Sequence, residues 1–197
     1  MMKPDLLIIF YRNPELGKVK TRLAATVGDG RALAIYLKLA AHTRSIASEV
    51  NCDRVVWYSD FVDTEDNWPN DLFLKDRQVG DTLGDRMHLA FDCAFQKGYQ
   101  RVCIIGTDCL ELTGEILNES FNKLITHDAV IGPALDGGYY LLGMKQLHTE
   151  LFSNKVWGNN TVYKNTVKDF EGLNITFGQL PCLTDIDEEK DLPARGI

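Results

Sequence analysis

The sequence lacks paired cysteines, a long apolar run and an excess of basic residues. Its five cysteines are an odd number without a C-x-x-C pair, a pattern that favours neither a disulfide framework nor a zinc site. The ordinary role of such cysteines is that of small, buried apolar residues. They are Cys52, Cys93, Cys103, Cys109 and Cys182.

The absence of a long apolar run and of net positive charge excludes further classes. The longest nearly uninterrupted apolar stretch, residues 6–11, is far shorter than the roughly 20 residues that cross a bilayer, and it lies too close to Met1 to follow the basic region of a signal peptide. The 21 basic and 28 acidic residues give a net charge of -7, which repels a polyanion unless the basic residues gather on one face. We therefore expect a cytoplasmic protein that has no membrane span and does not bind nucleic acid.

The remaining composition is that of a globular protein. The 197 residues are 45% hydrophobic, 25% charged and 10% aromatic, close to the average for soluble domains. A chain of this length buries roughly 70% of the surface that it exposes when unfolded. Because no repeat, low-complexity tract or long linker divides it, we expect one domain that spans residues 1–197.

Short apolar runs without alternation predict strands that are covered on both faces, as in parallel sheets. In the first half these runs are separated by segments with the apolar spacing of helices, and Gly98 follows the second such segment, where a helix that ends in a left-handed residue favours glycine. This alternation implies right-handed crossovers and a mostly parallel sheet with helices on both faces. The predicted strands are 6–10, 54–58 and 101–105, and the helical segments are 33–50 and 83–94.

In the second half the predicted strands follow each other with little helix between them, so we expect an antiparallel edge on the sheet. The polar stretch 60–71 has the composition of a surface loop. The predicted helices here are 113–126 and 161–170, and the predicted strands are 129–131, 139–144 and 175–180.

Ligands of such open sheets bind at the carboxyl ends of the strands, and a cluster of cations follows the first predicted strand. Residues 12–22 contain four cations, three of which, Lys18, Lys20 and Arg22, would add charge for a di- or triphosphate to the N–H groups of a loop that leads into a helix. A solvated basic face is the alternative. The segment is not a P-loop, because Val19 stands where that motif needs glycine, and no G-x-G-x-x-G follows the strand.

Carboxylates follow other predicted strands. Asp108 comes directly after the strand 101–105 and is the residue type that holds Mg²⁺; a turn or helix cap is the alternative. Asp136 precedes two glycines, which permit either a close approach to a ligand or a plain tight turn. Asp185 and Asp187 belong to an acidic run after the last strand, where a solvated tail is the usual explanation. Positive charge at one strand and aspartates at two others are what a metal–nucleotide site requires.

Gly80 and Gly84 lie at the predicted start of the second helix. Glycine and backbone donors at this place suit an anion or the edge of a base, although a plain helix start is an equal alternative. The sequence has no G-x-S-x-G elbow and no H-E-x-x-H motif, and its four histidines are scattered.

Five motifs occur in order and span nearly the whole chain. They are Lys18-Val19-Lys20-Thr21-Arg22-Leu23, Gly80 with Leu83-Gly84 and Arg86-Met87, Gly106-Thr107-Asp108-Cys109, Gly132-Pro133 with Asp136-Gly137-Gly138-Tyr139, and Asp185-Ile186-Asp187 with Asp191-Leu192. Together they resemble a bacterial glycosyltransferase-A-type (GT-A) family, once labelled as a domain of unknown function and also described as radical-SAM/selenodomain-associated transferase 1. That family is similar to nucleotide-diphospho-sugar transferases and to phospholactate and molybdopterin guanylyltransferases. One departure is Leu110, where the family commonly has proline.

The resemblance implies an α/β, three-layer Rossmann-like nucleotide-diphospho-sugar transferase (GT-A) fold with a mostly parallel, mixed central sheet. It also implies that the three cations of residues 18–22 hold the nucleotide phosphates. By the same analogy, Asp108 binds Mg²⁺ or Mn²⁺ in place of a D-x-D motif, Asp185 or Asp187 completes the metal site, and Asp136 faces the acceptor or the metal, where a carboxylate can act as general base.

Three interpretations of function stay open. The first is a metal-dependent glycosyltransferase that moves a sugar from a nucleotide sugar to a small-molecule acceptor, which the sequence leaves unspecified. The second is a nucleotidyltransferase that releases pyrophosphate from a nucleoside triphosphate. The third is a non-catalytic nucleotide-binding module, which would bind nucleotide without turnover and without a need for metal.

Overall fold

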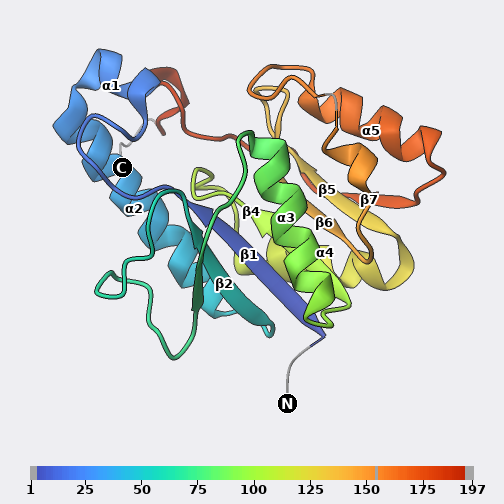
Figure 1. The fold of residues 1–197 in the computed structure, drawn as a ribbon. Helices are drawn as coiled ribbons and strands as arrows, with labels where there is room; N and C mark the ends of the chain where they lie inside the picture. Colours follow the sequence, from blue (N-terminus) through green and yellow to red (C-terminus); the bar gives the residue numbers. More distant parts are fainter. Residues whose placement is uncertain (1–3, 154, 194–197) are drawn as a thin grey trace.

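The protein is a mixed α/β fold built on a seven-stranded sheet (Figure 1). The computed structural model describes residues 4–153 and 155–193. The strands lie in the order β3-β2-β1-β4-β6-β5-β7. Their bounds are Asp5–Tyr11 (β1), Asp53–Tyr58 (β2), Leu74–Arg77 (β3), Arg101–Ile105 (β4), Ala129–Pro133 (β5), Tyr139–Met144 (β6) and Phe177–Gln179 (β7).

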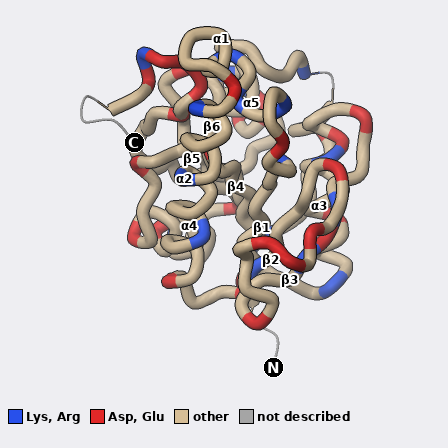
Figure 2. Tube along the Cα trace, turned by 90° about the vertical axis from the view of Figure 1, so that its left-hand side faces the viewer, with Lys and Arg blue, Asp and Glu red and all other residues tan. Residues whose placement is uncertain are grey.

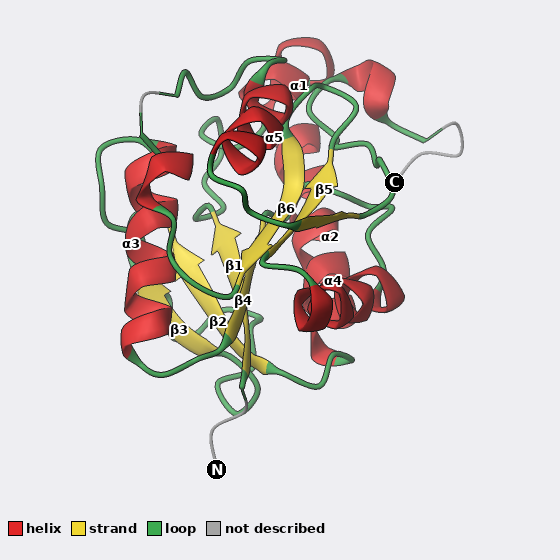
Figure 3. Ribbon diagram, turned by 90° about the vertical axis from the view of Figure 1, so that its right-hand side faces the viewer, coloured by secondary structure: helices red, strands yellow, loops and turns green. Residues whose placement is uncertain are grey.

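Two layers of helices cover the sheet, one on each face (Figure 3). The helices α2 and α4 pack on the face that carries Leu7 and Ile9, and α3 and α5 pack on the face that carries Leu6 and Ile8. Both faces of β1 are therefore buried, which is why its sequence is continuously apolar. The helices are α1 (Thr21–Val27), α2 (Asp29–Ser48), α3 (Leu83–Gln96), α4 (Gly114–Thr126) and α5 (Val162–Gly172), with 3-10 turns at Thr149–Leu151 and Glu189–Asp191.

This arrangement confirms the predicted three-layer α/β fold and the mostly parallel, mixed sheet, but the predicted antiparallel edge is wrong. The strand β6 is antiparallel to both of its neighbours, β4 and β5, and it lies inside the sheet. The edge strands β3 and β7 each pair in parallel. The chain reaches the second edge because α5 carries it from β6 past β5 before β7 begins.

After β7 the chain turns back across the carboxyl edge of the sheet. Leu183 forms a bridge with Ala134, and Asp185 forms a bridge with Cys109. Next to them, the Ile186 N–H donates to the Asp108 carbonyl at 2.9 Å, and the Ile186 side chain is buried against α1 and α2. In Figure 1 this segment, in red, lies beside α1. The alternative of a solvated acidic tail is therefore wrong for residues 183–187.

No helix in the described ranges is long and apolar enough to cross a membrane.

Candidate active site

The carboxyl edge of the sheet carries a network of two cations and two carboxylates. The Lys20 ammonium lies 2.6 Å from the Asp108 carboxylate and 3.0 Å from that of Asp187, and Arg22 pairs with Asp187 as well. The Lys20 side chain is only 5% exposed. Burial alone would lower the pKa of Lys20, but the two carboxylates outweigh it and raise that pKa. Lys20 is therefore a buried cation that joins β4 to the C-terminal segment. Figure 2 shows acidic and basic residues next to one another around α1.

Asp185 adds negative charge to the same edge. Burial, followed by the nearby charges of Asp108 and Asp136, raises its pKa to about 7, while Lys20 acts in the opposite direction. Burial is the largest cause of this shift, and the like charges around Asp185 add to it. With Asp108, Asp185 and Asp187, the edge holds three carboxylates beside the two cations of its network.

The three predicted metal ligands, Asp108, Asp185 and Asp187, meet at this edge, but they do not form a ready-made metal site. In the part of the chain that the structure describes, no group of three His, Cys, Asp or Glu side chains is arranged to hold a metal ion, and Lys20 contacts two of the three predicted ligands. Mg²⁺ needs only one or two protein carboxylates when substrate phosphates supply its other ligands. The oxygen donors fit an ion that is shared with a substrate.

The predicted phosphate-binding cations separate into two groups. Lys20 and Arg22 line a cavity of about 220 Å³ together with Asp108 and Asp187. Lys18, whose side chain is 68% exposed, instead pairs with Glu15 at 2.7 Å and is not among the residues that line this cavity. The structure therefore brings two of the three cations to the site.

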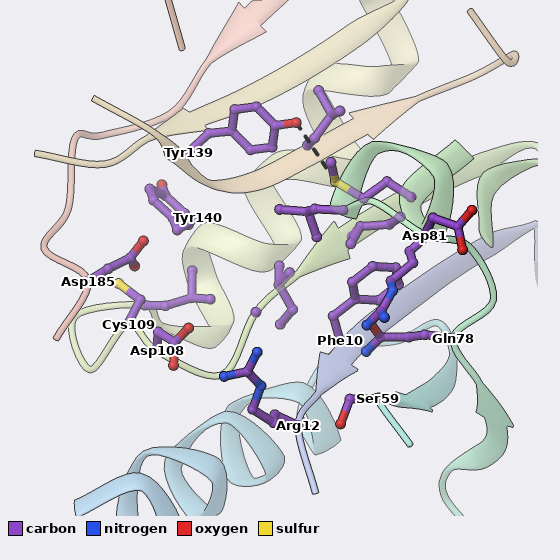
Figure 4. Close-up of a pocket in the computed structure, with 18 residues that line it drawn as sticks. Phe10, Arg12, Ser59, Gln78, Asp81, Asp108, Cys109, Tyr139, Tyr140 and Asp185 are labelled. Carbon is purple, nitrogen blue, oxygen red and sulfur yellow. Dashed lines mark hydrogen bonds between the residues drawn. The ribbon is translucent and has the colours of Figure 1, made fainter. Parts of the chain in front are cut away.

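Arg12 belongs to the cation cluster of residues 12–22 but is not among the three predicted phosphate-binding residues. It lines both the smaller cavity and the larger one beside it, and Figure 4 shows its side chain directed toward Asp108. Within residues 4–153 and 155–193 it has no carboxylate within ion-pair distance. Its position directly after β1, equivalent to that of Asp108 soon after β4, is the signal that would have identified it.

The larger cavity has a volume of about 540 Å³ and lies against the ends of β1, β4 and β6 and the start of α3 (Figure 4). Its wall is mainly apolar, with polar groups at two places (Figure 4): Arg12, Ser59, Asp108 and Asp185 at one, and Gln78, Asp81 and Arg86 at the other. The apolar residues include Phe10, Met87, Ile104, Tyr139 and Leu142. A few polar groups in a largely apolar cavity are typical of a small-molecule site.

Arg86 is held in place at its end of this cavity. Its Nε donates to the Gly80 carbonyl at 3.0 Å and its Nη1 to the Gln78 side-chain oxygen at 3.3 Å. Gln78 in turn donates to the Trp57 carbonyl at 2.7 Å. The guanidinium is therefore braced by two contacts and keeps further N–H groups for a ligand.

The structure places the two predicted glycines behind the cavity wall. Gly80 has a φ of 128° and supplies the carbonyl that braces Arg86. Gly84 is buried, and a Cβ on it would lie 2.7 Å from the Trp157 indole nitrogen. Neither residue is among those that line the larger cavity, so both glycines are explained by packing and backbone conformation, and the plain helix start is the better interpretation.

Asp136 lies in a tight turn between β5 and β6. Its Oδ1 accepts a hydrogen bond from the Gly138 N–H at 2.8 Å, and the next residue, Gly137, has a φ of 90°. The carboxylate does not line the larger cavity, but it is close enough to Asp185 to raise the pKa of that residue. The structure thus puts Asp136 in a turn at the rim of the site.

The comparisons with known proteins agree with this fold. The family described as "Uncharacterized protein conserved in bacteria (DUF2064)" matches residues 42–159. A solved structure from Desulfovibrio desulfuricans G20, described as a candidate nucleotide-diphospho-sugar transferase, is 32% identical, with a TM-score of 0.88 and coverage of 95% of this chain and 84% of that one. Among curated proteins, none matches the chain.

More distant structures share the fold alone. The 4-diphosphocytidyl-2C-methyl-D-erythritol synthase from Anaerococcus prevotii is 12% identical, with a TM-score of 0.56 and coverage of 95% of this chain and 92% of that one. A cytidylyltransferase from Leptospira borgpetersenii is 13% identical, with a TM-score of 0.53 and coverage of 92% and 76%.

Proposed function

The chain belongs to the bacterial DUF2064 family, and we propose that it is a metal-dependent transferase that uses a nucleotide-activated donor, with a nucleotide sugar as the donor and a sugar as the transferred group. The observation that carries this proposal is the meeting of Arg12 with Asp108 where the two cavities adjoin. A cation that pairs with no carboxylate of the described residues, and a strand-end carboxylate at the same point, suit a diphosphate that carries a metal ion.

In this proposal the donor has one orientation in the larger cavity. The diphosphate lies at the end with Arg12 and Asp108, and the base lies toward Phe10, Gln78 and Arg86. Phe10 offers a partly buried ring that stacks on Trp57 with a centroid distance of 6.2 Å, so an aromatic surface and a guanidinium are both available to a base. The volume of about 540 Å³ is within the usual range for a small-molecule pocket.

Asp108 and Asp185 are the residues that would hold the divalent ion, Mg²⁺ or Mn²⁺. When bound, the ion supplies positive charge to the phosphate oxygens as the leaving group departs. The side chains of the protein bind and orient the substrates. Arg12 holds and orients the diphosphate, and Lys20 keeps Asp108 and Asp187 at a fixed separation through its two ion pairs. Asp136, in its exposed turn beside Asp185, is placed to meet an acceptor that approaches from solvent.

A nucleotidyltransferase is the second candidate, because structures of cytidylyltransferases share the fold of this chain. Product analysis with Mn²⁺ separates the two. We expect the enzyme to release a nucleoside diphosphate from a nucleotide sugar. Release of pyrophosphate from a nucleoside triphosphate would favour the second candidate instead. Tight nucleotide binding that is insensitive to metal, with no turnover of either donor, would indicate a binding module and refute the proposal.

A further inference from the structure

Tyr36, on α2, has a hydroxyl group that contacts the ends of two neighbouring strands. The hydroxyl donates to the Arg12 carbonyl at 2.7 Å and accepts from the Arg12 N–H at 3.0 Å. The Thr107 hydroxyl lies 3.5 Å away and donates to the same oxygen. One side chain thus connects the residue after β1 to the residue before Asp108.

This contact lies just beyond the point where strand pairing ends. The last paired positions of β1 are Tyr11 with Tyr58 on one side, and Ile9 with Ile105 on the other. Arg12 lies beyond the paired positions, and its backbone N–H and carbonyl both bond to the Tyr36 hydroxyl. Because one hydroxyl bonds both the N–H and the carbonyl of Arg12, Tyr36 favours one position of the Arg12 backbone.

Two further observations make Tyr36 a rigid support. Its side chain is buried, with a relative exposure of 3%, and its ring stacks on Tyr11 with a centroid distance of 5.9 Å. Burial also raises the pKa of Tyr36, so the hydroxyl keeps the proton that it donates to Arg12. The tyrosine therefore has little freedom to move when a ligand binds.

We propose that Tyr36 is a positioning residue, which holds Arg12 and the Thr107–Asp108 segment at the separation that a metal-bound diphosphate requires. This inference rests on the proposed function, since it assigns Tyr36 to the same site. Tyr36 itself lines the smaller cavity, but its hydroxyl is engaged by Arg12 and Thr107, so it acts chiefly through Arg12, which lines both cavities. The opposing interpretation is that Tyr36 only fills the core.

Tyr58 supplies a matched control. It is fully buried in the same core cluster, and its hydroxyl donates to Asp66, in the loop beside β2 and away from the cavity-lining residues. Tyr36→Phe and Tyr58→Phe each remove one buried hydroxyl that makes a hydrogen bond, so both variants lose stability. Only a positioning role predicts that the two differ in ligand affinity.

The test is calorimetric titration of each full-length protein with pyrophosphate in the presence of Mg²⁺. We expect Tyr36→Phe to bind pyrophosphate about five- to tenfold more weakly than the wild type, and Tyr58→Phe to bind within about twofold of it. In an Arg12→Ala background, Tyr36→Phe should cause a smaller loss than in the wild type, because the guanidinium that it positions is gone and only the Thr107–Asp108 segment still depends on Tyr36. Equal affinities of the two tyrosine variants, or full additivity with Arg12→Ala, would overturn the proposal.

Hydrogen exchange without ligand separates this proposal from the proposed function. Tyr36→Phe should speed the exchange of the Arg12 amide, and Tyr58→Phe should not. If the wild type bound neither pyrophosphate nor a nucleotide, the proposed function would fail, and faster exchange at Arg12 would reduce Tyr36 to a structural support of that loop. If the wild type bound pyrophosphate and the Arg12 amide exchanged at an unchanged rate in Tyr36→Phe, the proposed function would stand and the role of Tyr36 would be refuted.

Discussion

Asp185 is the residue whose ionisation the fold opposes most clearly at the site. It is half-buried, and burial together with the charges of Asp108 and Asp136 raises its pKa to about 7. In the unfolded chain the same group ionises near its ordinary value of 3.8. Between these two values the native state binds a proton that the unfolded state has released, so the protein loses stability as the pH rises from about 4 through 7.

We predict that Asp185→Asn removes this loss. The variant should resemble the wild type in stability near pH 4 and exceed it at pH 8.5 by roughly 2–4 kcal/mol, because each unit of pKa shift corresponds to about 1.36 kcal/mol. Urea unfolding without metal, measured at both pH values, checks the prediction. Asp71→Asn, at an exposed loop position, should leave the pH profile unchanged. If the free energy of unfolding changed with pH in the same way in Asp185→Asn and in the wild type, the prediction would be contradicted.

Arg86 allows the direction of the bound donor to be tested. If the base lies at the end of the cavity where Arg86 is braced by Gly80 and Gln78, Arg86→Met should weaken the binding of a nucleoside diphosphate about tenfold, since a hydrogen bond to a charged group contributes about 1.5–3 kcal/mol. The affinity for pyrophosphate, which has no base, should stay within twofold. Arg77→Met, on the exposed part of β3, is the control. Equal losses for both ligands would place the phosphates, and not the base, at Arg86.

The elements of the fold differ in how far their sequences reveal them. The strands β1, β2 and β4 were predicted because both of their faces are buried and their sequences are continuously apolar. The strand β3, with the sequence Leu-Lys-Asp-Arg, was missed because it is a partly exposed edge strand. The helix α1 was missed because Leu23 is its one buried residue and no side chain caps its start.

Local sequence patterns did not predict the order of the strands in the sheet. The segment that forms β6 was predicted correctly as a strand, but its antiparallel place between β4 and β5 depends on the short turn at residues 134–138 and on the later arrival of β7. Pairing of this kind is a property of the whole sheet, since any apolar strand can lie beside several neighbours.

The turn between β5 and β6 is itself an element with a measurable constraint. Gly137 has a φ of 90°, and a Cβ there would collide with the Asn160 carbonyl, while Tyr163 donates to the Gly137 carbonyl at 2.9 Å. Gly158 also has a positive φ, of 75°, but has open space where a Cβ would lie. A side chain at Gly158 therefore adds strain alone, and one at Gly137 adds strain and a clash.

We predict that Gly158→Ala lowers the free energy of unfolding by about 1–2 kcal/mol, the cost of a left-handed residue, and that Gly137→Ala lowers it by at least about 3 kcal/mol, because overpacking adds a further 1–3 kcal/mol. Urea midpoints of both variants measure the difference. Losses of the same size would show that Gly137 is not packed against the Asn160 backbone as the structure has it.

At the scale of the whole molecule, the site is formed by segments that lie far apart in the sequence. The placement of Asp108 at this edge followed from the rule that ligands gather at the carboxyl ends of strands, and the assignment of Asp185 or Asp187 to the same site followed from the family resemblance. The pairing of Lys20 with Asp187 did not follow, because 167 residues separate the two and either residue alone has the pattern of a solvated charge. The same holds for Arg12, whose importance depends on the cavities that the assembled fold creates.

The excess of carboxylates over cations at this edge makes metal and nucleotide binding interdependent. Lys20 already neutralises part of the charge of Asp108 and Asp187, so Mn²⁺ alone should bind weakly, and a nucleoside diphosphate alone should meet the repulsion of Asp108 and Asp185. Together, each ligand removes the obstacle to the other. We predict that Mn²⁺ and a nucleoside diphosphate together raise the melting temperature by more than the sum of their separate effects. The total shift should be roughly 5–10 °C when the nucleotide is present at 100 times its Kd.

Thermal unfolding with each ligand, with both, and with both plus a chelator measures this coupling. The chelator should return the nucleotide to its small separate effect, and Asp108→Ala should remove the coupling, because Asp108 is the carboxylate shared by both cavities. Asp71→Asn, at an exposed position, should keep it. A nucleotide shift that persisted in full with the chelator would mean that the cations bind the phosphates without a metal ion, and that the carboxylates of this edge serve only to hold Lys20 and Arg22.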